Sequence, residues 1–244
     1  PGAENVTNWA KLYTETAVSY SRVFNTVDNS PESDYFGRIY AINRAGSLGN
    51  AANGLHVYSP EYVLENTTPY YSGQLGNPQR AAVDEFGTLY LADWSDAHSG
   101  VYLVDPANVS NSMAAFFEGT AASNGLITNN GVEVASGTPG VDIWGKGKDT
   151  ELYVYCEDEG TTLPANSVYM YKIGNEDGTL KSTWGEAPTK IYALKQANGD
   201  GNIWCTSHGF FVSLDRTSGS NNAGVPALML VDYERNTLFN SGNE

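Results

Sequence analysis

The sequence predicts an all-β protein built from repeated four-stranded antiparallel units, and three observations lead to this prediction. The 244-residue chain is 41% hydrophobic and 12% aromatic, with 16 tyrosines and 26 glycines, a balance typical of short strands joined by tight turns. Segments with one strand plan recur along the chain. Helical patterns are nearly absent, and the one candidate, 6–20, is expected to be a strand because of its Thr, Val and Tyr content.

The central pair of strands is the clearest part of each repeat. Its first strand occurs as GRIYAINR at 37–44, GTLYLADW at 87–94, TELYVYCED at 150–158 and GNIWCTSH at 201–208. Aligned on Tyr40, Tyr90, Tyr153 and Trp204, these segments lie 50, 63 and 51 residues apart. The second strand of each pair follows at 54–60, 100–106, 167–173 and 227–233. The matching apolar positions predict two neighbouring strands in every repeat.

Outer strands are expected on both sides of this pair. Short apolar runs ending in Gly-rich turns precede it at 81–87, 140–147 and 190–201, and a further run such as 113–117 follows it. Four antiparallel strands that recur in this way are typical of propeller blades. The sequence therefore predicts a single β-propeller domain over 1–244 with four to five blades. The repeats are expected at about 20–62, 77–117, 138–184 and 188–240.

Residues 77–106, NPQRAAVDEFGTLYLADWSDAHSGVYLVDP, resemble one blade of the NHL/YVTN-type β-propellers. That family's repeats have a proline, a small-residue strand ending in Asp, the motif Gly-x-Leu-Tyr-Val-Ala-Asp, a polar loop and a strand ending in Asp-Pro. The resemblance is looser over 138–173, and 35–60 and 188–233 keep only the central two strands. Propellers of this class usually close with six or more blades. The chain is therefore expected to be a fragment of a longer one, a small four- or five-bladed ring, or a ring completed by another chain, with the fragment as the simplest interpretation.

The charge of the chain argues against two classes of partner. A formal net charge of −15 repels the phosphates of nucleic acids and of anionic lipids, and no apolar stretch is long enough for a membrane-spanning segment. Few lysines, many Asn, Ser, Thr, Gly and Tyr residues, and a start at Pro1 favour a processed protein that is secreted, periplasmic or at the cell surface.

Ligand recognition is expected on the loops that join the second and third strands, because these meet at one face of a propeller. The loops are 44–53, 94–99, 157–166 and 207–226, and their lengths differ while the flanking strands do not. Exposed aromatic rings can stack on sugars or hold peptide side chains. The candidate ligand-binding residues are Trp94, Asp96, His98, Glu157, Asp158, His208, Phe210 and Phe211.

A divalent metal is one alternative at the 94–99 loop, where Asp93, Asp96 and His98 carry atoms that can ligate it. The favoured interpretation is a hairpin that Asp93 closes by accepting backbone amides. NGDGN at 198–202 resembles the start of a calcium loop, but the closing glutamate position holds Gly209. We therefore expect no resident cofactor.

Catalytic residues are not predicted. The three histidines, His56, His98 and His208, belong to no recognisable triad, and no Gly-x-Ser-x-Gly turn is present. Cys156 and Cys205 share one strand parity, but equivalent strands of neighbouring blades are usually too far apart for a bridge, so we expect two free, buried thiols, with a disulfide as the alternative.

These observations favour a binding module for a carbohydrate, a peptide or a partner protein. A metal-dependent propeller enzyme of the lactonase or lyase type is the first alternative, since such enzymes use acidic and amide ligands in place of histidine. The second is a structural subunit that another chain completes.

Overall fold

The computed structural model describes residues 21–45, 54–95, 98–119, 126–157, 161–194, 201–214 and 228–241. The fold is an all-β propeller of four antiparallel blades, as the sequence predicts. Within these ranges, short 3-10 turns at Pro106–Asn108 and Gly147–Asp149 interrupt the strands. Within the described ranges, no helix has the length and apolar character needed to cross a membrane. The strand predicted at 6–20 lies outside these ranges.

Each blade is a meander in which consecutive strands pair in antiparallel register. The first sheet contains β1 (Ser21–Val27), β2 (Ile39–Ala45) and β3 (Gly54–Tyr58). The second contains β4 (Pro78–Val83), β5 (Leu89–Asp93), β6 (Gly100–Val104) and β7 (Ala114–Glu118). The third contains β10 (Gly140–Trp144), β11 (Glu151–Cys156), β12 (Ser167–Lys172) and β13 (Lys190–Ala193). The fourth contains β14 (Gly201–Thr206), β15 (Gly209–Leu214), β16 (Leu228–Val231) and β17 (Thr237–Asn240).

Two features depart from a uniform four-stranded repeat. In the first sheet two isolated bridges to β3, Leu55 with Tyr70 and Tyr58 with Leu64, stand where a fourth strand would pair. Between the second and third sheets the chain forms an extra hairpin of β8 (Leu126–Asn129) and β9 (Val132–Ser136). This hairpin accounts for the longer spacing between the second and third repeats.

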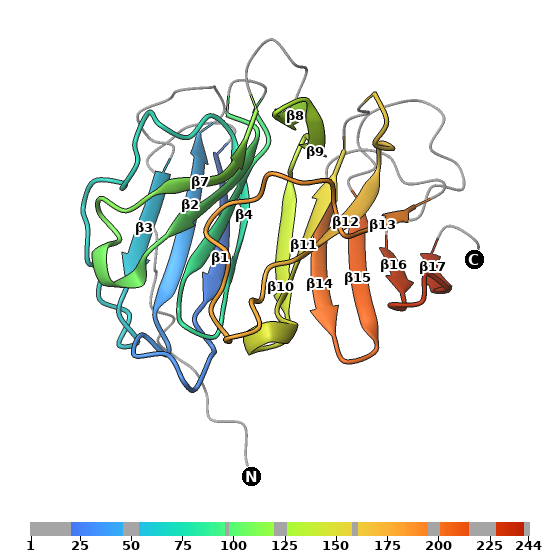
Figure 1. Ribbon diagram of the computed structural model, residues 1–244. Coiled ribbons are helices and arrows are strands. Elements are labelled where there is room, and N and C mark those ends of the chain that lie inside the picture. Colours follow the sequence, from blue (N-terminus) through green and yellow to red (C-terminus); the bar gives the residue numbers. More distant parts are fainter. Residues whose placement is uncertain are drawn as a thin grey trace.

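The first strands of the sheets lie next to one another, as the innermost strands of a propeller do. β1 packs on β4, β4 on β10, and β10 on β14, so the sheets follow in chain order (Figure 1). In the described part of the chain, no strand packing of similar extent joins β14 back to β1. The core therefore consists of three layers, each filling the space between two successive sheets.

Aromatic side chains at equivalent positions fill these layers. Tyr40, Tyr90 and Tyr153 lie in the second strands of the first three sheets and are almost completely buried. Their burial contributes to packing between neighbouring blades, which explains why an aromatic recurs at this place in the sequence. The sequence alignment of these three strands is confirmed by the sheet topology.

The alignment of the last repeat is wrong in one respect. β14, which carries Trp204, is the first strand of its sheet, whereas the sequence placed it second. The run before it, Lys190–Ala193, is the fourth strand of the third sheet. The connection 173–189 is long, so the fourth strand of the third sheet lies far along the sequence from its third strand. The spacing of the repeats therefore predicted that this strand belongs to the next blade. Trp204 is therefore no counterpart of Tyr90, and its side chain is exposed.

Candidate functional site

The predicted recognition residues fall on two connections, in the second and third sheets, and on the last sheet. Trp94 and His98 lie between β5 and β6, and Glu157 lies between β11 and β12, so all three are on connections of the predicted kind. His98 Nδ1 is 3.7 Å from Glu118 Oε1, and the Tyr102 hydroxyl donates to the same carboxylate oxygen. Asp96 and Asp158 lie outside the described residues.

The remaining predicted residues belong to the last sheet and lie elsewhere. The expected loop 207–226 is interrupted by β15, which begins at Gly209 because the turn after β14 is short. His208 is exposed in that turn, which joins first and second strands. Phe210 is fully buried toward the third sheet, and Phe211 is half-buried on the opposite face. Neither phenylalanine is a loop residue.

Asp93 closes the hairpin at the end of β5, as the favoured interpretation of this loop predicted. Its Oδ2 accepts the Gly76 amide at 2.7 Å, and its Oδ1 accepts the amides of Asn77 and Ser95, each at 2.9 Å. The side chain is fully buried, and this burial raises its pKa. Three backbone amides donate hydrogen bonds to the carboxylate, so Asp93 stabilises the hairpin and does not serve as a ligand-binding group. Among the described residues, no three His, Cys, Asp or Glu side chains form a group that could hold a metal.

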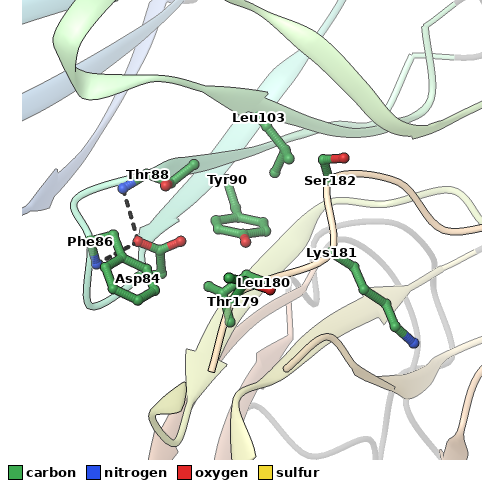
Figure 2. A pocket seen from close by; sticks show the side chains of 9 residues that line it. All are labelled: Asp84, Phe86, Thr88, Tyr90, Leu103, Thr179, Leu180, Lys181 and Ser182. Atoms are coloured by element: carbon green, nitrogen blue, oxygen red, sulfur yellow. Dashed lines mark hydrogen bonds between the residues drawn. The ribbon is translucent and has the colours of Figure 1, made fainter. Parts of the chain in front are cut away.

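A pocket of about 350 Å³ lies between the second sheet and a connection that leaves the third (Figure 2). One wall comes from the β4–β5 hairpin and the strands beside it, and the other comes from the connection between β12 and β13. The lining residues are Asp84, Phe86, Thr88, Tyr90, Leu103, Thr179, Leu180, Lys181 and Ser182.

The hairpin wall is fixed by Asp84. Its Oδ1 accepts the amides of Phe86 at 2.8 Å and Thr88 at 2.9 Å, which closes the turn. Gly87 has a φ of +84°, a left-handed conformation that suits glycine. The turn leaves the Phe86 ring 54% exposed at the mouth of the pocket, so an aromatic face is available to a ligand.

The carboxyl group of Asp84 is buried beside the Tyr90 hydroxyl. Burial outweighs the hydrogen bonds from the Thr88 and Phe86 amides and raises the pKa of Asp84 to about 6. Burial and the nearby Asp84 also raise the pKa of Tyr90 far above its usual range. Asp84 is therefore a carboxylate acceptor at neutral pH and a hydrogen-bond donor in mildly acidic solution.

The second wall is held in place by Trp184. Its backbone amide donates to the Phe116 carbonyl at 2.8 Å, which ties the connection to β7. The ring packs 6.3 Å from that of Phe116 and 5.3 Å from that of Tyr171, between centroids. A bridge between Gly174 and Leu180 folds the connection back on itself. The wall is thus a packed element attached to both neighbouring sheets.

Lys181 separates this pocket from a second one of similar size. Figure 2 shows its side chain directed away from Tyr90 and Leu103, and its Nζ lies 4.5 Å from the centre of the Trp184 ring. The second pocket is lined by Asn129, Asn130, Lys181, Thr183, Trp184, Gly185 and Glu186. A mainly apolar pocket and a mainly polar pocket therefore flank one lysine.

None of the nine residues around the first pocket was singled out from the sequence as a site. DEFG at 84–87 was predicted only as a turn, and 179–182 lies in a segment without a recognised motif. Two signals were present in the sequence. One is a large aromatic at a turn tip, and the other is a connection in the third repeat that is much longer than its counterpart, 105–113, in the second.

Comparison with known proteins identifies the fold and not the activity. No protein-family model and no curated protein matches the sequence. Among solved structures, a protein of unknown function from Bacteroides caccae matches with a TM-score of 0.50 and 8% identity over 94% of this chain and 70% of that chain. An identity this low supports a shared fold alone.

Two further structures match less closely. An α-L-arabinanase from Cellvibrio cellulosa, solved with arabinohexaose, matches with a TM-score of 0.44 and 12% identity over 88% of this chain and 75% of that chain. A DUF4623 family protein from Bacteroides eggerthii matches with a TM-score of 0.32 and 12% identity over 73% of this chain and 54% of that chain.

Proposed function

We propose that this protein is a carbohydrate-binding β-propeller module and that its ligand site is the pocket between the second sheet and the 173–189 connection. The observation that carries the proposal is the exposed Phe86 ring at the mouth of a pocket whose walls are apolar and whose rim bears hydroxyl groups. Tyr90, Leu103 and Leu180 supply the apolar walls.

The chemistry of the pocket suits a sugar better than a peptide side chain. A pyranose ring has an apolar face that stacks on an aromatic ring and a rim of hydroxyls that need hydrogen-bond partners. Thr88, Thr179 and Ser182 offer hydroxyls, and Asp84 offers a carboxyl group. A volume of about 350 Å³ lies at the small end of ligand pockets, which favours one or two sugar units.

Binding is favoured over catalysis by the number of acidic groups. Glycoside hydrolysis generally uses two carboxyl groups on opposite sides of the scissile bond. Asp84 is the one carboxyl group among the described residues that line this pocket. The lactonase-type alternative has no comparable support, because Asp84 is the one carboxylate among these lining residues that could ligate a metal.

Two broader proposals accompany this one. The resemblance of 77–106 to NHL/YVTN-type repeats supports descent from that class of propeller. An acidic chain rich in Asn, Ser, Thr and Gly supports a location outside the cytoplasm, where extracellular carbohydrate would be met.

The proposal is tested by screening the protein against an array of oligosaccharides and measuring the affinity of the best ligand by calorimetry. We expect Phe86→Ala to weaken binding at least about tenfold, because it removes the stacking surface. Phe36→Ala is the matched control, since Phe36 is 56% exposed on the equivalent hairpin of the first sheet and does not line the pocket. Equal affinity of Phe86→Ala and the unaltered protein would refute the proposed site.

A further inference from the structure

A second pocket, also of about 350 Å³, lies beside the proposed carbohydrate site and shares Lys181 with it. Asn129 and Asn130, at the tip of the β8–β9 hairpin, form one side, and the connection 181–186 forms the other. The further polar side chains of this pocket belong to Lys181, Thr183 and Glu186. We call it the polar pocket, and we call the pocket around Phe86 the apolar pocket.

The tip of the hairpin is fixed against the connection. Asn130 has a φ of +50° and Gly131 a φ of +80°, which is the conformation that an Asn-Gly turn of two residues favours. Gly185 allows the close approach of the two sides, because a Cβ at this position would lie 2.6 Å from Asn129 Nδ2. The carboxamides at the tip are therefore positioned beside the connection without a ligand.

Lys181 is also held in position. Its backbone amide donates to the Ile173 carbonyl at 2.9 Å, and its Nζ lies 4.5 Å from the centre of the buried Trp184 ring. Attraction between the ammonium group and the face of the ring restricts where the charge can lie. Figure 2 shows the side chain directed away from Tyr90, so the charge is on the side of the polar pocket.

The ammonium group of Lys181 has no carboxylate partner among the residues that the structure describes. The ion pairs there are Arg38–Glu65, His98–Glu118, Lys146–Glu32 and Lys148–Glu176. Glu186 lines the same pocket as Lys181 and does not pair with it. In a chain with 28 acidic and 13 basic residues, a positioned cation of this kind is available to an anionic group of a ligand.

The two pockets differ in how they would receive such a group. The apolar pocket contains the carboxyl group of Asp84, which repels a second negative charge at neutral pH. The polar pocket offers the Lys181 ammonium, and the carboxamide of Asn129 and the hydroxyl of Thr183 can donate hydrogen bonds to the remaining oxygens of an anion. An anionic group is therefore favoured in the polar pocket alone.

We propose that the ligand is an acidic oligosaccharide whose anionic group, a uronic acid carboxylate or a sulfate ester, binds Lys181 in the polar pocket. The adjoining sugar unit stacks on Phe86 in the apolar pocket, so the two pockets form one site for at least two units. This inference rests on the proposed carbohydrate function and adds the class of sugar.

The experiment is calorimetry with pairs of short oligosaccharides that differ in charge. The panel contains galacturonate, glucuronate, mannuronate and guluronate oligosaccharides with their methyl esters, and sulfated galactose oligosaccharides with their unsulfated forms. We expect the best acidic member to bind at least about tenfold more tightly than its neutral counterpart, because a charge-assisted hydrogen bond to Lys181 is lost in the neutral form. Whether that member is a uronate or a sulfate ester distinguishes the two sources of the charge.

Two substitutions in the polar pocket have opposite expected effects. Lys181→Met keeps an apolar stem over Trp184 and should abolish the preference for the acidic form, while the affinity for the neutral form stays within about twofold. Glu186→Gln removes a negative charge from the same pocket and should strengthen binding of the acidic form by about threefold. Lys148→Met is the matched control, since Lys148 lies outside both pockets, and it should leave both affinities unchanged.

The results that contradict this inference differ from those that contradict the proposed function. Equal binding of acidic and neutral forms, equal weakening of both by Lys181→Met, or binding of no acidic member of the panel would overturn the inference and show that Lys181 only covers Trp184. The proposed function survives each of these results if a neutral sugar binds and Phe86→Ala weakens it. A preference for the acidic form that depends on Lys181 and not on Phe86 supports the polar pocket and contradicts the proposed stacking site.

Discussion

Replacing Trp184 by alanine tests whether the 173–189 connection is a packed wall of the pocket. The indole is only 6% exposed and contacts the rings of Phe116 and Tyr171, so the substitution removes the main apolar contact between the connection and the sheets. Its Nε1 also donates to the Glu186 carbonyl at 2.6 Å. We expect the connection to detach locally while the four sheets keep their strands.

The cost can be estimated from the contacts. Removing a buried Trp or Phe side chain from a core lowers the free energy of unfolding by about 3 to 5 kcal/mol. Trp184 lies on a connection that can partly collapse into the space left, and water can solvate the Glu186 carbonyl, so the lower end applies. A loss of about 3 kcal/mol corresponds to a fall in Tm of about 6 to 12 °C for a chain of this size.

Urea denaturation followed by circular dichroism measures this change as a lower midpoint with an unchanged slope. Trp144→Ala is the control, and we expect it to cost about 1 kcal/mol or less because that ring is partly exposed. A loss below about 1 kcal/mol for Trp184→Ala would refute the packing role assigned to this ring.

Three further predictions follow from the titratable groups. Burial raises the pKa of Glu133, but hydrogen bonds from the Thr162 hydroxyl and nearby amides overcome this and hold it at about 2. The stabilisation by Glu133 is therefore present above the unfolded pKa of about 4.3 and lost as pH falls toward 2, so the Tm difference between the protein and Glu133→Gln should shrink over that range. Asp84 has the opposite sign: burial raises its pKa to about 6, so its contribution is greatest below the unfolded pKa of about 3.9 and is lost as pH rises through 6. The stability of the protein relative to Asp84→Asn should fall across that interval, and a flat difference would contradict the assignment. Cys156 and Cys205 form no disulfide, and Cys156 is fully buried whereas Cys205 is only partly buried, so a thiol reagent should titrate Cys156 only after denaturation.

Much of the fold could be predicted from the sequence because the strand pattern repeats. Tyr40, Tyr90 and Tyr153 occupy equivalent buried positions, and the alternation around each was enough to place the central strands. The hairpin closed by Asp93 was predicted as well, since a carboxylate after a strand is suited to accepting backbone amides. The free state of both cysteines is also as predicted, although Cys205 is only partly buried.

The last blade could not be placed in the same way. The run at 190–193 has the apolar character of any blade strand, and sequence does not state which sheet an apolar run joins. That choice depends on the path of the connection 173–189, which crosses toward β7 through Trp184. The error moved Phe210 and Phe211 from a strand into a predicted loop.

The pocket was missed for a related reason. Its walls come from two blades, and 179–182 is brought beside the 84–88 turn by tertiary packing alone. A repeat-based alignment compares equivalent positions in different blades, so it does not detect a site formed by non-equivalent positions. The predicted loop-face residues remain predictions, and Trp94, His98 and Glu157 do lie on connections of the expected type.

The most direct test of the proposed function is a titration of isotope-labelled protein with its best oligosaccharide, followed by the backbone amide shifts. The proposed site predicts the largest changes at Phe86, Thr88 and residues 179–182. Changes confined to the connections at 94–99 and 157–166 would contradict it and return recognition to the loop face expected from the sequence.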